Sequence, residues 1–363
     1  MAAILPTNGT SDSGMSAGSF AEATYVQEIW NVVGPLARNP LTQERASKMY
    51  GELAGMDLRK LRGSPDEWFN LVTSAARSRN YTSAEKILEV AIDLHPDDAD
   101  LRCEWFQFAY GHGSMAEALE AREELENLGP DKTYACWRYW CYNSTFESQF
   151  LHDKERAVEI LDQGLSHVPL AGLLNIYRNY RLALIDGATR PSLTADPSVT
   201  DHAAVVARVE EKYRAGLSLG IESGYALAVD LAKLLRERTS GMPTEDADQI
   251  LDEALRQLDI AERTYTDDGN HPLWDIYKEK AITLMARRRY EDALQIFRSL
   301  PGYLLNDSTT VMARYAANMT GQEFRPAGQS DGMDRSDELA QRIERLERTL
   351  GELLSALHAN TGE

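Results

Sequence analysis

The sequence predicts an all-α fold, a solenoid of antiparallel helix hairpins followed by a separate heptad helix. Three observations lead to this fold class. Apolar residues recur at helical spacing through most of the chain, and no segment makes a convincing strand. An alanine followed twelve residues later by a proline occurs three times, in the pairs Ala84 and Pro96, Ala118 and Pro130, and Ala157 and Pro169. With 363 residues and 43% apolar content, the chain is long enough to bury a sizeable core.

The spacing of these pairs defines a repeat. Ala84 and Ala118 are 34 residues apart, as are Pro96 and Pro130, whereas the step to Ala157 is 39 residues. A fixed period of this length is typical of stacked supersecondary units. The longer step indicates five extra residues upstream of Ala157, which we place in the turn at 146–153.

Each repeat is predicted to hold two amphipathic helices. The first unit places apolar residues on one face of each helix, namely Trp68, Leu71, Val72, Ala75 and Ala76, then Ala84, Ile87, Leu88, Ala91 and Ile92. A small residue such as Ala84 lets two helix axes approach to about 8 Å. A proline such as Pro96 has no N–H and disfavours helical geometry in the residue before it, so it ends the second helix at a fixed point.

At these positions the sequence resembles the tetratricopeptide repeat (TPR) family. The first unit carries the residues of the 34-residue family pattern at Trp68, Leu71, Tyr81, Ala84, Leu88, Ala91 and Pro96, and a fourth match carries Tyr277, Ala281, Tyr290, Ala293 and Phe297. The second and third units depart from it, because Phe106 and Trp140 stand where a small residue is usual and Arg122 where a bulky apolar one is. The resemblance covers residues 66–169 and 274–300.

Helical pairs without this signature fill the rest of the chain. They are predicted at 173–187, 204–220 and 245–265, and we interpret them as degenerate repeats, since a lone hairpin cannot bury its face and must stack on neighbours. The predicted domains are a disordered leader at 1–19, N-terminal capping helices at 20–62, the TPR-like solenoid at 63–320, a linker at 321–334 and a C-terminal coiled-coil or capping helix at 335–359.

The C-terminal helix has the apolar spacing of a coiled coil. Its apolar residues alternate at four and three residues, at Leu339, Ile343, Leu346, Leu350, Leu353 and Leu357. Three roles fit this pattern: capping the open end of the solenoid, joining two copies of the chain as a homo-oligomer, or binding a helix of another protein.

Composition argues against several classes of partner. The formal charge of −19 disfavours direct binding to nucleic acid, which draws its affinity from clustered lysine and arginine. No apolar run is long enough to span a membrane, and the first residues lack the features of a secretion signal. Three cysteines, an odd number, suit a reducing compartment. We therefore expect a cytoplasmic protein.

Catalysis and cofactors are not expected. The segment GLSLG at 216–220 matches the serine-hydrolase pattern G-x-S-x-G, but it ends a helix where that pattern needs a strand-to-helix turn, so its glycines are predicted to pack or stop the helix. Cys136 and Cys141 are five residues apart, which on a helix turns the thiols away from each other and gives no metal site. The two glycine-rich patterns that bind nucleotide phosphates, G-x-x-x-x-G-K-[ST] and G-x-G-x-x-G, do not occur.

The resemblance to TPR proteins implies a non-catalytic scaffold or adaptor whose groove binds a peptide or a partner helix. The first helix of each hairpin would line the groove, and the matching positions here are Phe69, Thr73, Cys103, Gln107, Tyr110, Trp137 and Cys141. These residues lack the Lys, Asn and Arg clamp with which some TPR proteins hold acidic chaperone tails. Two alternatives stay open: a scaffold of an RNA-processing complex, similar to half-a-TPR proteins, and a regulatory subunit of an enzyme complex.

The aromatic cluster at 134–142 has two interpretations. Its residues Trp137, Tyr139, Trp140 and Tyr142 are of the types that dominate binding hot spots. Such residues also fill the seam between neighbouring hairpins. The sequence does not separate the two roles.

Overall fold

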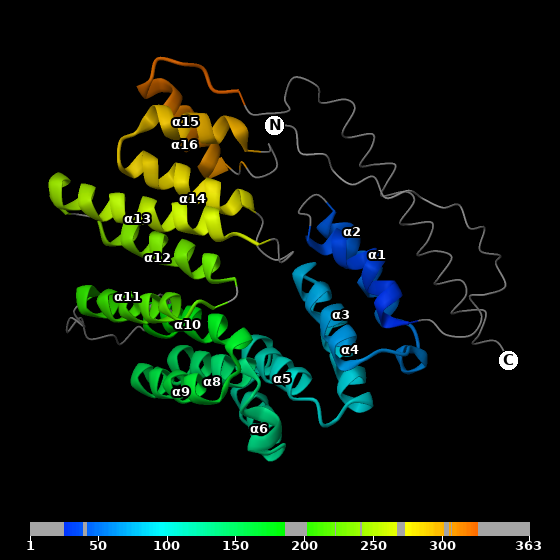
Figure 1. The fold of residues 1–363 in the computed structure, drawn as a ribbon. Coiled ribbons are helices and arrows are strands. Elements are labelled where there is room, and N and C mark those ends of the chain that lie inside the picture. Colours follow the sequence, from blue (N-terminus) through cyan, green and yellow to red (C-terminus); the bar gives the residue numbers. More distant parts are fainter. Residues whose placement is uncertain are drawn as a thin grey trace. The chain divides into compact units, whose positions relative to one another are not determined.

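Every regular element of the described residues is a helix. The computed structural model of the protein describes residues 25–38, 42–185, 202–221, 223–239, 242–266, 273–300, 305 and 307–325 (Figure 1). Within these ranges the only bridge outside a helix joins Tyr25 to Arg62. The predicted leader at 1–19 and the six heptad residues Leu339 to Leu357 lie outside the described residues. The predicted domain boundaries stay predictions.

The described residues form two compact units, and the boundary falls inside α5 (Ala99–His112), between Leu101 and Arg102. The first unit contains α1 (Val26–Arg38), α2 (Gln43–Ala54), the short 3-10 helix η1 (Leu58–Lys60), α3 (Pro65–Arg77) and α4 (Tyr81–Leu94). Here α3 packs against α1 and α4 packs against α2, so the hairpin of α1 and α2 and the hairpin of α3 and α4 stack first helix on first helix and second helix on second helix. A capping box starts α3, because Ser64 and Glu67 exchange hydrogen bonds between side chain and backbone.

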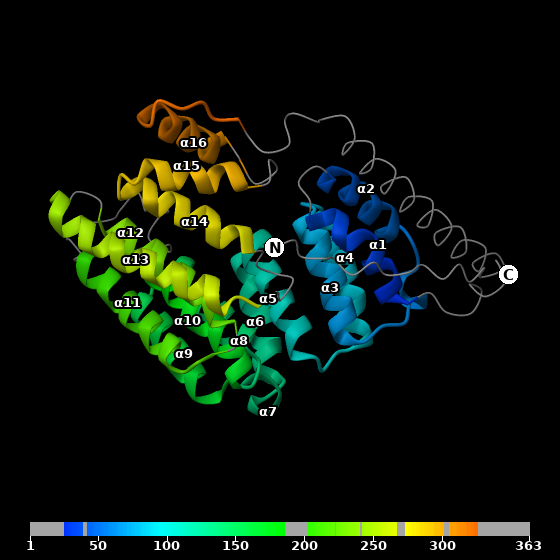
Figure 2. The same ribbon diagram turned by 45° about the horizontal axis from the view of Figure 1, so that its top comes forward.

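The second unit repeats this hairpin arrangement (Figures 1 and 2). Its helices after α5 are α6 (Met115–Asn127), α7 (Pro130–Thr133), α8 (Trp137–Gln149), α9 (Lys154–His167), α10 (Leu170–Leu184), α11 (His202–Ser218), α12 (Gly224–Arg238), α13 (Thr244–Thr264), α14 (Leu273–Ala286), α15 (Tyr290–Ser299) and α16 (Asp307–Met319). The first helices α8, α10, α12, α14 and α16 contact one another in succession. The predicted fold class, an all-α stack of TPR-like hairpins, is confirmed.

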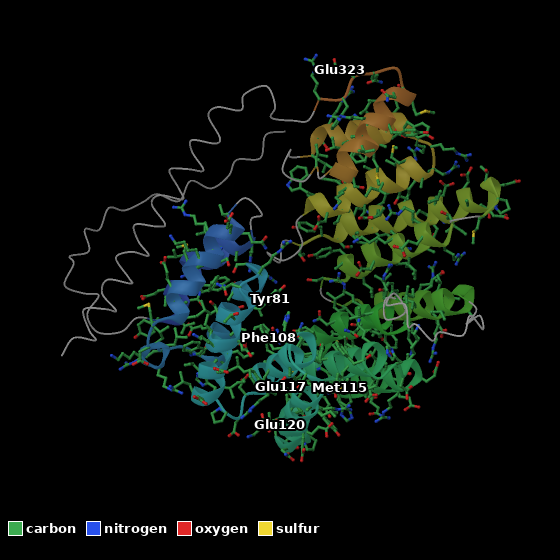
Figure 3. The ribbon with its side chains drawn as sticks, turned by 180° about the vertical axis from the view of Figure 1, so that it is seen from behind. Tyr81, Phe108, Met115, Glu117, Glu120 and Glu323 are labelled. Atoms are coloured by element: carbon green, nitrogen blue, oxygen red, sulfur yellow. The ribbon has the colours of Figure 1, made fainter. Side chains whose placement is uncertain are left out.

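The alanine and proline of each repeat act as predicted. Ala84, Ala118 and Ala157 are fully buried on the second helices α4, α6 and α9. Each proline follows the end of such a helix within three residues, as Pro96 follows Leu94. The opposite face of these helices is solvated, and on α6 it carries Met115, Glu117 and Glu120 (Figure 3).

The five extra residues of the third repeat lie mainly in a different turn from the predicted one. The starts of α4 and α5 are 18 residues apart, whereas the starts of α6 and α8 are 22 residues apart. Four of the five residues therefore belong to the connection that contains α7, and the placement at 146–153 was wrong. Pro130 starts this short helix, since a proline at the first helical position loses no hydrogen bond.

The degenerate repeats pack as closely as the regular ones. The two glycines of GLSLG show how: a Cβ at Gly216 would lie 2.7 Å from the Leu227 side chain and 2.8 Å from that of Tyr177, so α11 needs a glycine beside α10 and α12. Gly220 has a φ of +62°, which ends the helix and favours glycine. Gly216 has the packing role and Gly220 the helix-ending role that the sequence predicted.

A bulky residue of the third repeat is also accommodated by a glycine. The sequence had placed Trp140 at a small-residue position, but with the extra residues at α7 it is the fourth residue of α8, as Trp68 is the fourth residue of α3. Trp140 therefore matches the tryptophan of the first unit, and it faces Gly164 on α9. A Cβ at Gly164 would lie 2.8 Å from the Trp140 Cγ atom. The absence of a side chain at Gly164 therefore makes room for the indole of Trp140 where α8 meets α9.

We expect Gly164→Ala to lower the free energy of unfolding by about 1–3 kcal/mol, because the added methyl group overpacks the seam. The matched control is Gly111→Ala on α5, where a Cβ would meet no atom within 4 Å. This control should change stability by less than about 1 kcal/mol, in the stabilising direction. Equal effects of the two substitutions in urea unfolding would contradict the packing of Trp140 on Gly164.

Asp162 joins three helices of the second unit. Lys212 of α11 lies 2.6 Å from its carboxylate, and the Tyr180 hydroxyl of α10 donates to the same group. Burial tends to raise the pKa of Asp162, but the hydrogen bonds from Lys212 and Tyr180 outweigh it and hold the pKa below its usual value. A carboxyl whose pKa is lowered in the folded state stabilises the fold above its unfolded pKa and loses this contribution as the pH falls.

Replacing Asp162 by Asn should therefore lower stability at neutral pH and make it less sensitive to acid below about pH 4. The measurement is the thermal unfolding midpoint between neutral and acidic pH. Glu123→Gln, on the exposed face of α6, is the control and should leave the acid dependence unchanged. An Asp162→Asn protein with the acid dependence of the original chain would contradict this role.

Candidate functional site

The predicted groove residues differ in how far they reach the surface. Cys103 and Cys141 are only 0% and 1% exposed, and both belong to the core of the second unit. Burial raises the pKa of the Cys141 thiol well above its usual value. These two thiols pack between helices and do not present a contact to a ligand.

The remaining predicted positions are partly exposed. Phe69 and Thr73 are half-buried on α3 of the first unit, and Thr73 donates its hydroxyl to the Asn70 carbonyl. Gln107 and Tyr110 are half-buried on α5, where the Tyr110 ring packs edge-on against Phe106. Trp137 is half-buried at the start of α8.

The aromatic cluster at 134–142 is divided between the seam and the surface. Trp140 is buried, stacks on His167 and donates its indole N–H to the Tyr134 carbonyl at 2.9 Å. Tyr142 donates its hydroxyl to the buried Glu104 carboxylate at 3.2 Å. These side chains fill the seam between hairpins, whereas Trp137 opens onto a pocket.

This pocket is a cavity of about 410 Å³ in the second unit. It lies on the first helices α8, α10 and α12, with one contribution from α11. Its lining consists of Trp137, Asn175, Arg178, Asn179, Arg181, Leu182, Tyr213, Asp230, Lys233 and Glu237. Its volume is in the range of ligand-binding clefts, about 300–1,000 Å³. Trp137 is the one predicted groove residue that lines it.

The helical period of α10 supplies one wall of the pocket. Arg178 and Asn179 lie three and four residues after Asn175, so all three side chains share a face. Ile176 and Tyr180 of the same helix are buried on the other side. The alternation that makes α10 amphipathic thus places two amides and a guanidinium along the pocket.

Trp137 forms an end wall that is held from two sides. The Arg138 guanidinium lies 4.5 Å from the centre of its ring, within cation–π range. Gly172 on α10 lies close by, and a Cβ there would be 3.2 Å from the Trp137 Cβ and 2.6 Å from the Val168 side chain. The glycine therefore lets α10 approach the indole.

Ion pairs cross the pocket from α10 to α12. Arg178 donates to Asp230 at 2.5 Å, and the Asp230 side chain is 14% exposed. Lys233 lies 3.8 Å from the same carboxylate. Farther along, Arg181 lies 2.9 Å from Glu237. Each charged side chain of the lining thus has a partner of opposite charge within the lining itself.

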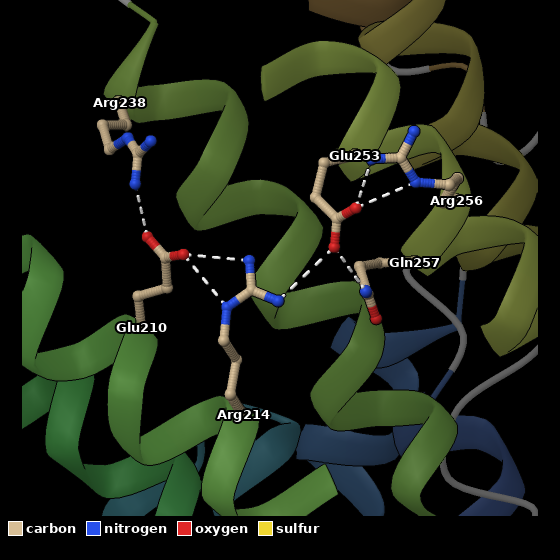
Figure 4. A network of polar contacts seen from close by, with 6 residues as sticks. All are labelled: Glu210, Arg214, Arg238, Glu253, Arg256 and Gln257. Carbon is tan, nitrogen blue, oxygen red and sulfur yellow. Dashed lines mark hydrogen bonds and ion pairs between the residues drawn. The ribbon is translucent and has the colours of Figure 1, made fainter. Parts of the chain in front are cut away.

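A second set of ion pairs joins the outer helices. Glu210 on α11 accepts from Arg214 and from Arg238 of α12, and Arg214 continues to Glu253 of α13 at 3.4 Å (Figure 4). Arg256 lies 2.5 Å from the same Glu253 carboxylate. These contacts tie α11 to α12 and α13 and so join consecutive hairpins.

The cysteines form a pair that the sequence did not indicate. The Cys103 Sγ atom on α5 lies 3.9 Å from the Cys136 Sγ atom at the N-cap of α8. Sequence spacing had drawn attention to Cys136 and Cys141, but the repeat brings positions 33 residues apart into contact. Within the described ranges no group of three or more His, Cys, Asp or Glu residues could hold a metal ion.

The comparisons with known proteins show no family for the chain. No protein-family model and no curated protein matches the chain. Among solved structures it is similar to PilW, a widely conserved type IV pilus biogenesis factor, with 12% identity and a TM-score of 0.40 over 68% of this chain and 97% of that one. It is also similar to the human IFIT1 dimer with PPP-AAAA, with 12% identity and a TM-score of 0.40 over 96% of this chain and 83% of that one. Both are TPR-containing helical repeat proteins, and neither similarity bears on what this chain binds.

No described helix has both the length and the apolar character needed to cross a membrane.

The sequence analysis missed the polar residues of the pocket because they lie in repeats without the alanine and proline signature. Asn175, Arg178 and Asn179 could have been found from the polar stripe opposite the apolar face of α10. Lys233 and Asp230 give a weaker signal, since their contribution depends on how α12 packs against α10.

The cysteine geometry predicts a selective oxidation. Diamide, a diazene that takes up the two thiol hydrogens, should join Cys103 to Cys136 in a disulfide, because their sulfurs already lie 3.9 Å apart. Peptide mass mapping should find this pair in the intact chain and in Cys141→Ser, and no cross-link in Cys103→Ser. A link between Cys136 and Cys141 would contradict the placement of α5 against the start of α8.

Proposed function

We propose that this protein is a non-catalytic scaffold that binds a segment of another protein in the pocket on α8, α10 and α12. The observation that carries the proposal is the position of the pocket: it lies on consecutive first helices, where stacked hairpins leave a continuous surface. Stacked repeats use such extended surfaces for binding.

The chemistry of the lining supports binding in preference to catalysis. Its charged residues are joined in ion pairs: Asp230 pairs with Arg178 and Lys233, and Glu237 pairs with Arg181. The other lining residues are two asparagines, two aromatic residues and a leucine. Such a set contains no activated nucleophile beside a general base. It does contain the aromatic and amide groups that are common at protein interfaces.

The charge of the chain supports a protein partner over nucleic acid. A net charge of −19 repels phosphate backbones, and the pocket offers only one cation more than its carboxylates, with Arg178, Arg181 and Lys233 set against Asp230 and Glu237. The heptad residues at 339–357 are a second candidate contact, through which two copies could associate or another helix could bind. They lie outside the described residues.

A photo-cross-linking experiment tests this function. Benzoylphenylalanine is placed at Asn175 in the pocket or, as a control, at Gln163, an exposed residue of the second helix α9 that does not line it. Irradiation of the full chain in its native cells should give covalent adducts with another polypeptide from position 175 and few from position 163. Equal adducts from both positions, or adducts with RNA alone, would reject the proposed function.

A further inference from the structure

The three cysteines of the chain differ in how far solvent reaches their sulfurs. Cys103 on α5 and Cys141 on α8 are only 0% and 1% exposed, whereas Cys136 is partly exposed at the N-cap of α8. The oxidation of a thiol depends strongly on its exposure. An oxidant dissolved in water therefore meets the Cys136 sulfur first.

Cys103 is placed to react with an oxidised Cys136. Its Sγ atom lies 3.9 Å from the Cys136 Sγ atom. It belongs to a core cluster with Phe106 and Phe146, which shield it from solvent but leave it next to Cys136. A sulfenic acid condenses with a neighbouring thiol to give a disulfide. The pair thus combines one sulfur that solvent reaches with one that can resolve its oxidised form.

Cys141 is less suited to either step. It lies five residues after Cys136 on α8, a spacing at which side chains of one helix point in different directions. Burial raises the pKa of its thiol well above the usual value, and the thiolate is the form that an oxidant attacks. Cys141 is therefore expected to stay a thiol.

The position of Cys136 connects the pair to the pocket. The next residue, Trp137, is the first of α8 and lines the end of the pocket. A disulfide requires the two sulfurs to approach from 3.9 Å to about 2.05 Å. Cys103 is enclosed in the core, whereas Cys136 follows the short turn between α7 and α8, in which Ala135 is exposed. The start of α8 is therefore the part that can move, and it carries the indole.

We propose that Cys136 and Cys103 are a modification site for hydrogen peroxide, which joins them in a disulfide that shifts Trp137 at the end of the pocket. The site goes beyond the proposed function, because it does not depend on what the pocket binds.

The reaction has two steps. The Cys136 sulfur attacks one oxygen of the peroxide, the O–O bond breaks, and a sulfenic acid and one water form. The Cys103 sulfur then bonds to the Cys136 sulfur, and the sulfenic hydroxyl leaves with the Cys103 proton as a second water. The two thiols lose two hydrogens and two electrons, and the peroxide is reduced to two waters.

Peroxide treatment of the full chain, with and without the sulfenic-acid trap dimedone, tests the order of these steps by peptide mass mapping. The original chain should lose two of its three thiols and gain the link between Cys103 and Cys136. Cys103→Ser should stop at the sulfenic acid and carry dimedone on Cys136. Cys136→Ser should lose thiols at least about tenfold more slowly. Cys141→Ser is the matched control and should form the same link as the original chain.

A second measurement on the original chain serves if a serine variant is poorly folded. A short pulse of iodoacetamide should label Cys136 before the other two cysteines, and the labelled chain should then resist peroxide. Labelling of Cys103 or Cys141 first would overturn the site. So would a dimedone adduct on either of these residues in the original chain, a disulfide that includes Cys141, or a bond between two copies of the chain.

Fluorine NMR of the chain grown with fluorotryptophan tests the effect on the pocket. The chain has six tryptophans, so the signal of Trp137 is assigned from its loss in Trp137→Phe. Forming the disulfide should shift this signal and leave that of Trp274 on α14 unchanged, and dithiothreitol should reverse the shift. An unchanged Trp137 signal in the oxidised chain, or an equal shift in peroxide-treated Cys136→Ser, would contradict the link to the pocket. Neither result depends on a binding partner.

Discussion

The close approach of paired helices at small residues is the constraint on which this structure depends. Ala84, Ala118 and Ala157 are buried where a second helix meets its first helix. Gly164 likewise lets α9 approach Trp140 of α8 closely. An isolated hairpin leaves one apolar face in water, and stacking on the next hairpin removes that face from solvent. Fixed helix ends, set by the prolines, keep each hairpin in a similar geometry, so that neighbouring pairs can stack repeatedly.

The pocket is a consequence of this stacking. Successive first helices lie side by side, so residues from α8, α10 and α12 that are far apart in sequence come to line one cavity. Ion pairs between the same helices, such as Arg178 with Asp230, join α10 to α12 across the lining. A corresponding set on the outer helices, centred on Glu210 and Arg214, joins consecutive hairpins there (Figure 4). An acidic chain thus keeps its charges paired where its hairpins meet.

The sequence predicted the hairpins better than the site, and the reason is physical. Burial restricts residue type strongly, so Ala84 and Pro96 mark helix packing and helix ends wherever they recur. Pocket positions carry no such restriction, and Asn175 and Asn179 resemble any solvated polar residues until the neighbouring helices are placed. Cys103 was predicted at a groove position by counting within a repeat, but the bulky Phe106 of the same helix and its neighbours enclose it in the core. The extra residues at α7 could not be located from spacing alone, because an insertion changes the period equally at any point of the repeat.

The most direct measurement of the central claim is the helicity of one hairpin removed from its neighbours. Far-ultraviolet circular dichroism of the segment 137–167, which contains α8 and α9, can be compared with that of the full chain. If the hairpins depend on stacking to bury their apolar faces, the segment alone should be largely unfolded in water, as expected for short helices without tertiary contacts. A segment that keeps native helicity and unfolds cooperatively on its own would contradict the account.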